Sequence, residues 1–228
     1  MVAPTEKKWF RPTKKELKEF NVSLDDGEVH ISADYNLKAN RKTLYGWRIT
    51  YAVSSLGAME ISSSLEVKAV EAETDLPRIG LMLELARDFE NAAYYGRGEA
   101  ENMPDFNAQA PIGIYSAKVC DMREKYVYPQ ESGMHCDTKW LKLTDHNGGE
   151  IAFYADDVFN FSLRHFTQEA LNKAAHEEDL KDMGITLLSI DGKTRGIGSS
   201  SCGPDTREEY RLNALEDNTF SFTLIPRI

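Results

Sequence analysis

The residue types best suited to chemistry gather in the segment YVYPQESGMHCDTKW, residues 126–140. Within it, Cys136 stands next to His135, and a thiol beside an imidazole is the pairing that produces a thiolate nucleophile. Side chains of neighbouring residues diverge on a strand, however, and neither residue has an orienting Asn or Asp at a diagnostic position. The sequence therefore argues against a Cys–His nucleophile here.

The same segment suits a structural role. Its Pro-Gln-Glu-Ser-Gly turn lies between aromatic residues and includes Gly133, which provides the backbone freedom of a tight corner between sheets. Buried Gln130 and Glu131 would then form hydrogen bonds with loop backbone that water cannot reach. We interpret the segment as a corner in preference to an active site.

Acidic residues elsewhere are candidates for general acid–base chemistry, which needs two carboxylates facing one substrate. Neighbouring acids on a strand point to opposite faces, so solvated loop charges explain these pairs better than catalysis. We assign no catalytic residue in this chain. The pairs considered are Glu99 and Glu101, Asp156 and Asp157, and Glu208 and Glu209.

Metal and phosphate sites are not expected either. The histidines lack the i, i+4 pairing of a zinc site, and no two cysteines have C-x-x-C spacing, so we expect reduced thiols and no metal. The segment GRGEAEN, residues 96–102, lacks the third glycine of a phosphate loop and no helical pattern follows it. The residues concerned are His30, His135, His146, His165 and His176, with Cys120, Cys136 and Cys202.

The elements that would position these residues are mostly strands. Apolar residues alternate with a period of two in residues 79–85 and 220–225, and less strongly in several other stretches separated by turns such as DDG and DHNGGE. Many short strands with Gly-rich turns predict an all-β sandwich. The weaker stretches are residues 28–38, 47–55, 62–73, 150–157 and 184–192.

Two segments favour helices. Residues 167–181 offer Thr167 as N-cap, Glu169 in the first turn and Lys181 in the last turn. Residues 13–20, TKKELKEF, have the Thr-x-x-Glu spacing of a capping box, although a solvated leader into the first strand explains them equally well.

Composition narrows the possible partners. The formal net charge is −10 and no basic run exists, so nucleic acid is not an expected partner. No apolar stretch approaches the roughly 20 residues of a membrane-spanning helix, and residues 1–20 lack the apolar core of a secretory leader, so we expect a cytoplasmic chain that does not contact membranes. A leader on a longer precursor would change the compartment. No repeat or linker divides the chain, which predicts one domain.

Three ordered motifs carry a resemblance to a known family. They are LPRIGLMLEL with GRGEAENMPDF, then YVYPQESG, then the segment that ends in GIGSSSCGPD. Together they resemble the C-terminal domain of family 2 β-galactosidases, which in some bacteria is a separate small chain. The resemblance is strong from about residue 76 to the end, weaker over residues 20–75 and absent before them.

The resemblance implies a large twisted β-sandwich of the galactose-mutarotase-like kind, also called a supersandwich, over residues 21–228, with residues 1–20 as a leader or linker. It also implies that the two catalytic glutamates lie on a TIM-barrel domain outside this chain, and that the domain normally begins upstream of residue 1. The expected partners are those catalytic domains or a separate large chain. No cofactor is expected in this chain, although the full enzyme often uses Mg²⁺ and Na⁺.

One loop has an implied binding role. In some similar enzymes a tryptophan at the position of Cys202 stacks on the sugar, so the resemblance implies that Ser201, Cys202 and Gly203 lie at the substrate. A small buried cysteine in a glycine-rich loop is the competing interpretation. Met103 and Phe106 stand where the family commonly has Tyr and Arg, and loss of that arginine removes a hydrogen-bonding fork.

Three functions follow as hypotheses. The first is a non-catalytic domain or small subunit of a β-galactosidase, inactive alone, that completes the active-site rim and reaches galactosides only in the assembled site. The second is a stand-alone carbohydrate-binding module that uses Trp47, Trp140, Tyr94 and Tyr95 as platforms. The third is an aldose 1-epimerase, on fold analogy alone, for which we find no suitable acid–base pair.

Overall fold

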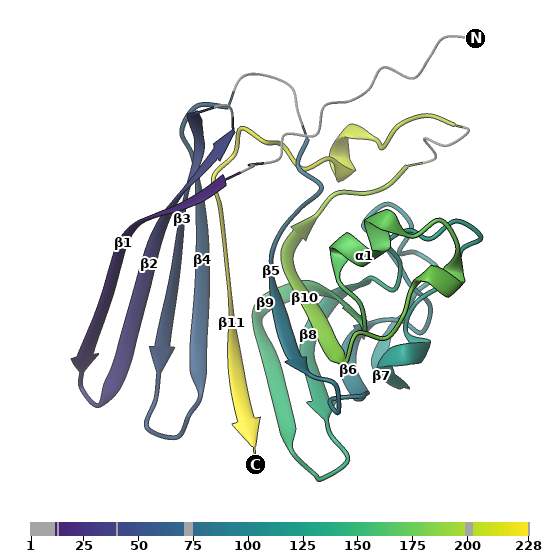
Figure 1. Ribbon diagram of the computed structural model, residues 1–228, viewed down its shortest axis with the longest axis horizontal. Helices are drawn as coiled ribbons and strands as arrows, with labels where there is room; N and C mark the ends of the chain where they lie inside the picture. Colours follow the sequence, from purple (N-terminus) through teal and green to yellow (C-terminus); the bar gives the residue numbers. More distant parts are fainter. Residues whose placement is uncertain (1–11, 13, 40, 71–74, 199–202, 228) are drawn as a thin grey trace.

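The computed structural model describes residues 12–227 except 13, 40, 71–74 and 199–202. Strands dominate the described part, and all pairings between them are antiparallel (Figure 1). The strands are β1 (Lys14–Asp25), β2 (Glu28–Ala39), β3 (Lys42–Val53), β4 (Met59–Val67), β5 (Arg78–Ala86), β6 (Asn91–Arg97), β7 (Ile112–Lys118), β8 (His135–Thr144), β9 (Glu150–Arg164), β10 (Ile185–Thr194) and β11 (Asn218–Arg227).

The sheet has one long path and one branch. The path runs β1-β2-β3-β4-β11-β9-β8-β6-β7. Strand β9 makes the branch, because its first part pairs with β11 up to Ala155 and its last part, from Asn160 to Arg164, pairs with β10. Strand β5 then pairs with β10. A single long strand therefore belongs to the main sheet at one end and to a short β9-β10-β5 layer at the other.

One face of the main sheet is apolar across many strands, and we call it the inner face. Because side chains alternate along a strand, register partners in a sheet share a face. One row of partners is Val22, Ile31, Tyr51, Ile61, Phe222 and Ala155. The alternation found in the sequence is thus the pattern of a sheet with one apolar face.

The short layer lies over part of this inner face. Leu188 and Ile190 of β10 are fully buried in the same core cluster as Ile61 and Phe222, and three leucines of β5 pack against that cluster. Apolar surface removed from water in this way supplies most of the driving force for folding. Figure 1 shows β5 and β10 beside β9, while β1–β4 extend away from them. The prediction of an all-β sandwich is confirmed, and the structure adds that the second layer branches from the same sheet through β9.

Residues 13–20 differ from one expectation. The described part of this segment belongs to strand β1, which pairs with β2 from Lys14 onward, so the helical alternative is wrong. Alternating Phe20, Val22 and Leu24 gain partners on β2 in a hairpin, and this strand pairing outweighs the capping signal. The boundary expected at residue 20 therefore falls inside a strand.

The other predicted helix exists but is shorter. Helix α1 spans Gln168–Lys173, and the Thr167 side chain caps it by accepting a hydrogen bond from the backbone N–H of Ala170. A separate 3₁₀ turn covers Glu177–Asp179, so Lys181 does not lie in the last helical turn. Over the described residues, no helix is long and apolar enough to cross a membrane.

Candidate functional site

The loop with the implied binding role leaves the end of β10. Ser201 and Cys202 lie outside the described residues, while Gly203 is described and exposed. The loop begins at Arg195, and its return begins near Asp205 and Thr206. The described stems therefore show how the protein holds the loop.

A buried guanidinium joins the two stems. Arg195 is 6% exposed and donates hydrogen bonds to Thr206 Oγ1 at 2.8 Å and to Asp205 Oδ1 at 2.9 Å. Its Nε donates to Asp75 Oδ2 at 3.0 Å, which ties the loop to the segment before β5. Charge-assisted hydrogen bonds to carboxylates are about twice as strong as neutral ones. Arg195 therefore fixes the base of the loop.

Asp105 holds the outgoing stem from the other side. Its carboxylate accepts the backbone N–H of Ile197 at 3.2 Å and of Gly198 at 2.6 Å. Gly198 has a φ of +65°, and a Cβ there would lie 2.6 Å from the backbone nitrogen of Thr206. A side chain is disfavoured at this position both by the backbone conformation and by the close neighbour.

These stems border a surface pocket of about 440 Å³. It combines carboxylates and a guanidinium with aromatic rings, which is the mixture that binds hydroxyl groups and the apolar face of a sugar. Phe106 occupies this pocket at the position where the resemblance leads one to expect arginine. The pocket is lined by Asp105, Phe106, Gly198, Pro204, Asp205, Thr206, Arg207 and Tyr210. Sequence reasoning missed Arg207 and Tyr210, for which it offered no signal.

Residues 126–134, by contrast, form an irregular segment that leads into β8. Gln130 and Glu131 are exposed, so their expected burial is wrong. Glu131 forms an ion pair with Arg78 and lies 3.9 Å from Arg164 Nη1. Gly133 has a φ of +77°, as its turn requires. This segment therefore links β5 and β9 through charges on its surface.

His135 and Cys136 do not form a nucleophilic pair. The Cys136 thiol donates to the backbone carbonyl of Asn102 at 3.4 Å, and His135 Nδ1 lies 3.0 Å from the Tyr94 hydroxyl. Burial raises the pKa of Cys136 to about 12 and lowers the pKa of His135 to about 4. Both groups are therefore neutral near pH 7 and unsuited to thiolate chemistry.

Asp191 is the most perturbed carboxyl group. It is 1% exposed, and burial raises its pKa to about 7, opposed by Arg78, whose Nε lies 3.5 Å from Asp191 Oδ2. The nearby charges of Glu131 and Arg164 add smaller effects of opposite sign. Because the carboxyl is covered from solvent, we interpret it as structural.

The described part of the chain has no side-chain cluster of the usual metal-binding kind. There, no group of three or more His, Cys, Asp or Glu residues fits a metal ion.

The four rings proposed as sugar platforms do not act together. Tyr94 is buried, and Trp47 stacks on Tyr35 at 5.0 Å and donates its indole N–H to Ser63. Tyr95 and Trp140 are register partners on adjacent strands, and Tyr95 is 37% exposed. Of the four, these two form the remaining candidate platform.

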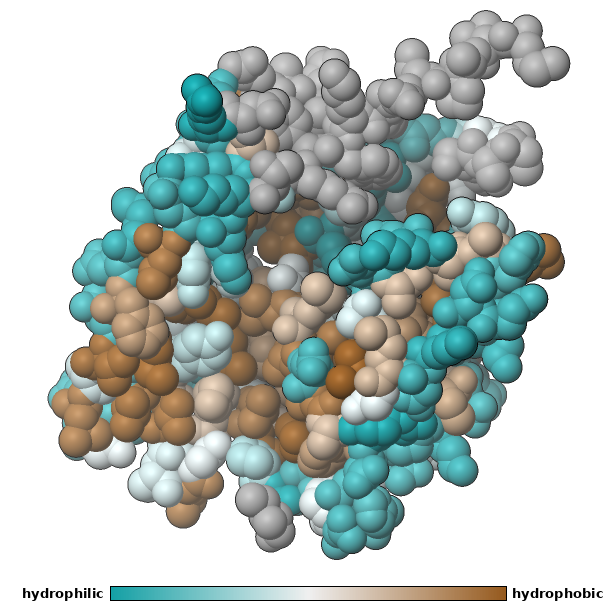
Figure 2. Space-filling model, in the orientation of Figure 1, coloured by the Kyte–Doolittle hydropathy of each residue, from teal (hydrophilic) through white to brown (hydrophobic). Residues whose placement is uncertain are grey.

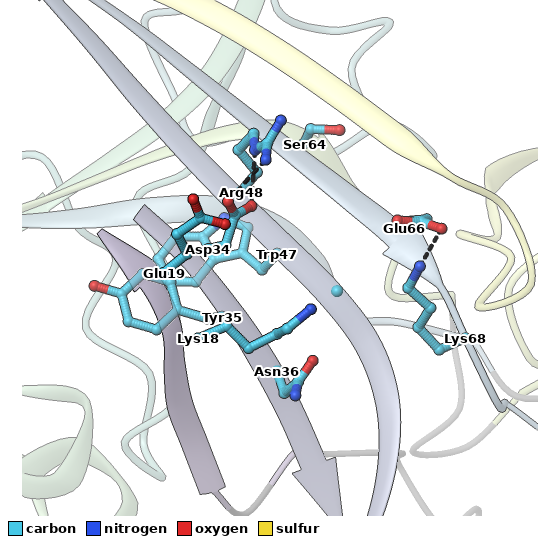
Figure 3. Close-up of a pocket in the computed structure, with 11 residues that line it drawn as sticks. Lys18, Glu19, Asp34, Tyr35, Asn36, Trp47, Arg48, Ser64, Glu66 and Lys68 are labelled. Atoms are coloured by element: carbon cyan, nitrogen blue, oxygen red, sulfur yellow. Dashed lines mark hydrogen bonds and ion pairs between the residues drawn. The ribbon is translucent and has the colours of Figure 1, made fainter. Parts of the chain in front are cut away.

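A groove of about 330 Å³ on the opposite face of β1–β4 is strongly polar (Figure 3). The Arg48 guanidinium donates to both carboxylate oxygens of Asp34 at 2.7 Å, and this contact holds the pKa of Asp34 below its usual value. Lys68 pairs with Glu66 at the other end of the groove. Because these charged side chains already pair with one another at the surface, we assign no ligand to this groove.

Comparison with known proteins identifies the family. A sequence model described as "Beta galactosidase small chain" matches residues 3–224, so the match begins upstream of the residues where the resemblance was expected to start. The β-galactosidase of Staphylococcus xylosus is 32% identical over 208 residues, which is 90% of this chain and 20% of that protein. The β-galactosidase of Aeromonas hydrophila is 34% identical over 84% of this chain and 18% of its own length, and that of Kluyveromyces lactis is 33% identical over 73% and 16%.

Two solved structures are similar in fold at low scores. A GalM/aldose epimerase homologue from C. elegans has a TM-score of 0.47 at 10% identity and covers 92% of this chain and 69% of its own. A galactose mutarotase related enzyme from Lactobacillus acidophilus has a TM-score of 0.42 at 9% identity, with coverages of 92% and 72%.

The family match spans nearly the full chain, whereas the chain spans about a fifth of the first curated relatives. This chain belongs to the β-galactosidase small-chain family.

Proposed function

We propose that this chain is a non-catalytic domain or small subunit of a family 2 β-galactosidase, an enzyme that hydrolyses terminal β-D-galactosides. Its role is to complete the active-site rim and the assembly, while the catalytic glutamates belong to other domains. The observation that carries this proposal is the match over residues 3–224 to a small chain, in proteins about five times longer than the matched segment.

The loop after β10 is the part of this chain that we assign to the rim. Arg195 and Asp105 hold the two described stems of this loop through hydrogen bonds. The adjacent pocket supplies hydroxyl-binding groups and rings. We therefore propose Ser201, Cys202 and Gly203 as contacts near bound galactoside, with no aromatic platform at Cys202.

Complementation tests this function. The purified chain alone should not hydrolyse a nitrophenyl β-galactoside. Mixed with the Staphylococcus xylosus enzyme from which the matching segment has been deleted, it should restore hydrolysis. Turnover by the chain alone, above that of a mock preparation, would refute the non-catalytic role. Failure to restore turnover in the mixture would refute the role in assembly.

The stand-alone carbohydrate-binding module is the second candidate, and the exposed Tyr95 beside Trp140 favours it. Calorimetry with galactose and lactose at millimolar concentration measures this directly. A heat of binding that disappears in Tyr95→Ala would support a carbohydrate-binding module. The absence of any heat of binding would refute it.

A further inference from the structure

The apolar inner face is not fully covered. Where β5 and β10 lie over it the core is buried, but at β1 the same face is open to solvent. Leu17, Phe20, Val22 and Leu24 of β1 are 53%, 57%, 57% and 75% exposed, and Val29 of β2 is 36% exposed. We call these five side chains the β1 patch. In Figure 2 the hydrophobic colour covers the lower left, where Figure 1 places β1–β4, and continues toward the centre.

The size of the β1 patch separates it from ordinary surface. Five large apolar side chains, each more than one-third exposed, present on the order of 500 Å² of apolar surface, which is near the upper end for a monomeric protein. The patch also continues the core through register, because Phe20 pairs with Ala33 and Val22 with Ile31. The patch is therefore exposed because the second layer, made by β5 and β10, ends before it reaches β1.

The covering layer ends in an open strand edge. Among the described residues, β5 pairs with β10 alone, so its other edge carries unpaired backbone N–H and C=O groups. An apolar cleft of about 250 Å³ lies between this end of the layer and the main sheet. Ile79 of β5 lines it on one side, and Trp47 of β3 and Leu65 of β4 line it on the other. On the side of the main sheet the cleft reaches Leu37 of β2.

We propose that the β5 edge and the β1 patch together bind β-strands from the polypeptide that carries the catalytic domains of the enzyme. This inference rests on the proposed function. The first incoming strand pairs with β5, and the layer then extends over β3, β2 and β1. Each such strand has apolar residues at alternate positions facing the patch and polar residues facing outward.

Two properties favour a strand over another occupant. An extended segment can bond to the β5 backbone and cover an apolar sheet face at the same time. With the half-buried side chains around it, the β1 patch offers a surface of the order of 800 Å² that a stable partner needs. A second copy of this chain would cover the patch with its own patch, but it would leave both β5 edges unpaired.

Paired variants on one strand separate the two faces of β1. Phe20→Lys with Leu24→Lys places charges on the patch, while Asn21→Lys with Ser23→Lys places the same charges on the opposite face of the same strand. All four positions are exposed, so both variants of the free chain should melt within about 2 °C of wild type. Light scattering of the free chain at micromolar concentration should give a monomer.

Association is measured with the Staphylococcus xylosus enzyme from which the matching segment has been deleted. We expect the patch variant to bind at least tenfold more weakly than wild type and the control variant to bind within twofold. Hydrogen exchange in the wild-type complex should slow at least tenfold at β5 amides as well as in β1 and β2, because new strand bonds protect them.

Several results would overturn the inference. If the patch variant restores activity and binds like wild type, the proposed function stands and the surface is wrong. Protection of β1 and β2 without β5 would mean that the partner covers the face without pairing as a strand. A free chain that dimerises until Phe20 and Leu24 become lysines would identify a second copy as the occupant. If the wild-type chain neither binds nor restores activity, the proposed function is wrong, and the proposed partner is wrong as well.

Discussion

Asp191 should make this protein less stable as pH rises from about 5 to 7. Its carboxyl is buried beside Arg78 and has a pKa of about 7, against 3.8 for an ordinary aspartate. Between these two values the native state keeps the proton and the unfolded chain releases it. Unfolding therefore releases a proton, and a higher pH favours unfolding.

The magnitude follows from the pKa difference. Each pH unit between the two pKa values costs about 1.4 kcal/mol of unfolding free energy, so the total across the interval is about 4 kcal/mol. Between pH 5 and pH 7 the loss is about 2 kcal/mol. In Asp191→Asn, which keeps the shape and cannot ionise, this loss is absent. The variant should therefore gain about 2 kcal/mol relative to wild type over that range, or about 4–8 °C in Tm for a chain of this size.

Thermal or urea unfolding of both proteins at pH 5, 6 and 7 provides the test. The difference between them isolates Asp191, because the other titrating groups are common to both. Asp157→Asn is the matched control, since it makes the same chemical change in a side chain that is 92% exposed. A difference between wild type and Asp191→Asn that is constant across the range would refute the argument from burial.

Two further changes test local features. Gly198→Ala should lower the unfolding free energy by about 2–3 kcal/mol, measured by urea denaturation, because the φ is unfavourable for alanine and the added Cβ would meet Thr206. Gly27 has a φ of +82° with open space around it, so Gly27→Ala reports the effect of φ alone and should lower the unfolding free energy by about 1 kcal/mol. Equal losses in these two variants would contradict the close approach. Thr167→Ala should cost about 1 kcal/mol by loss of the hydrogen bond from the Ala170 N–H, and an unchanged Tm would show that this cap contributes nothing.

Sequence reasoning predicted part of the site correctly and missed the rest. It selected the loop after β10 through the resemblance, and Asp105 lay in one of the quoted motifs. It could not show that Arg195 meets Asp75 and Thr206, because Asp75 is 120 residues away and the contact with Thr206 depends on how the loop returns. It also placed Glu131 in a buried corner, whereas the carboxylate lies at the surface opposite Arg78.

The sequence by itself determined the all-β class, several of the strands, the start of helix α1 and the family. These properties depend on alternation, capping residues and ordered motifs, which are local along the chain. Tertiary structure alone decided that residues 14–20 form a strand, that Asp191 is buried, and that the apolar face of β1 remains uncovered while β5 and β10 cover the same face further along the sheet. Pairing and burial depend on which distant strands meet, and a local pattern does not specify that choice.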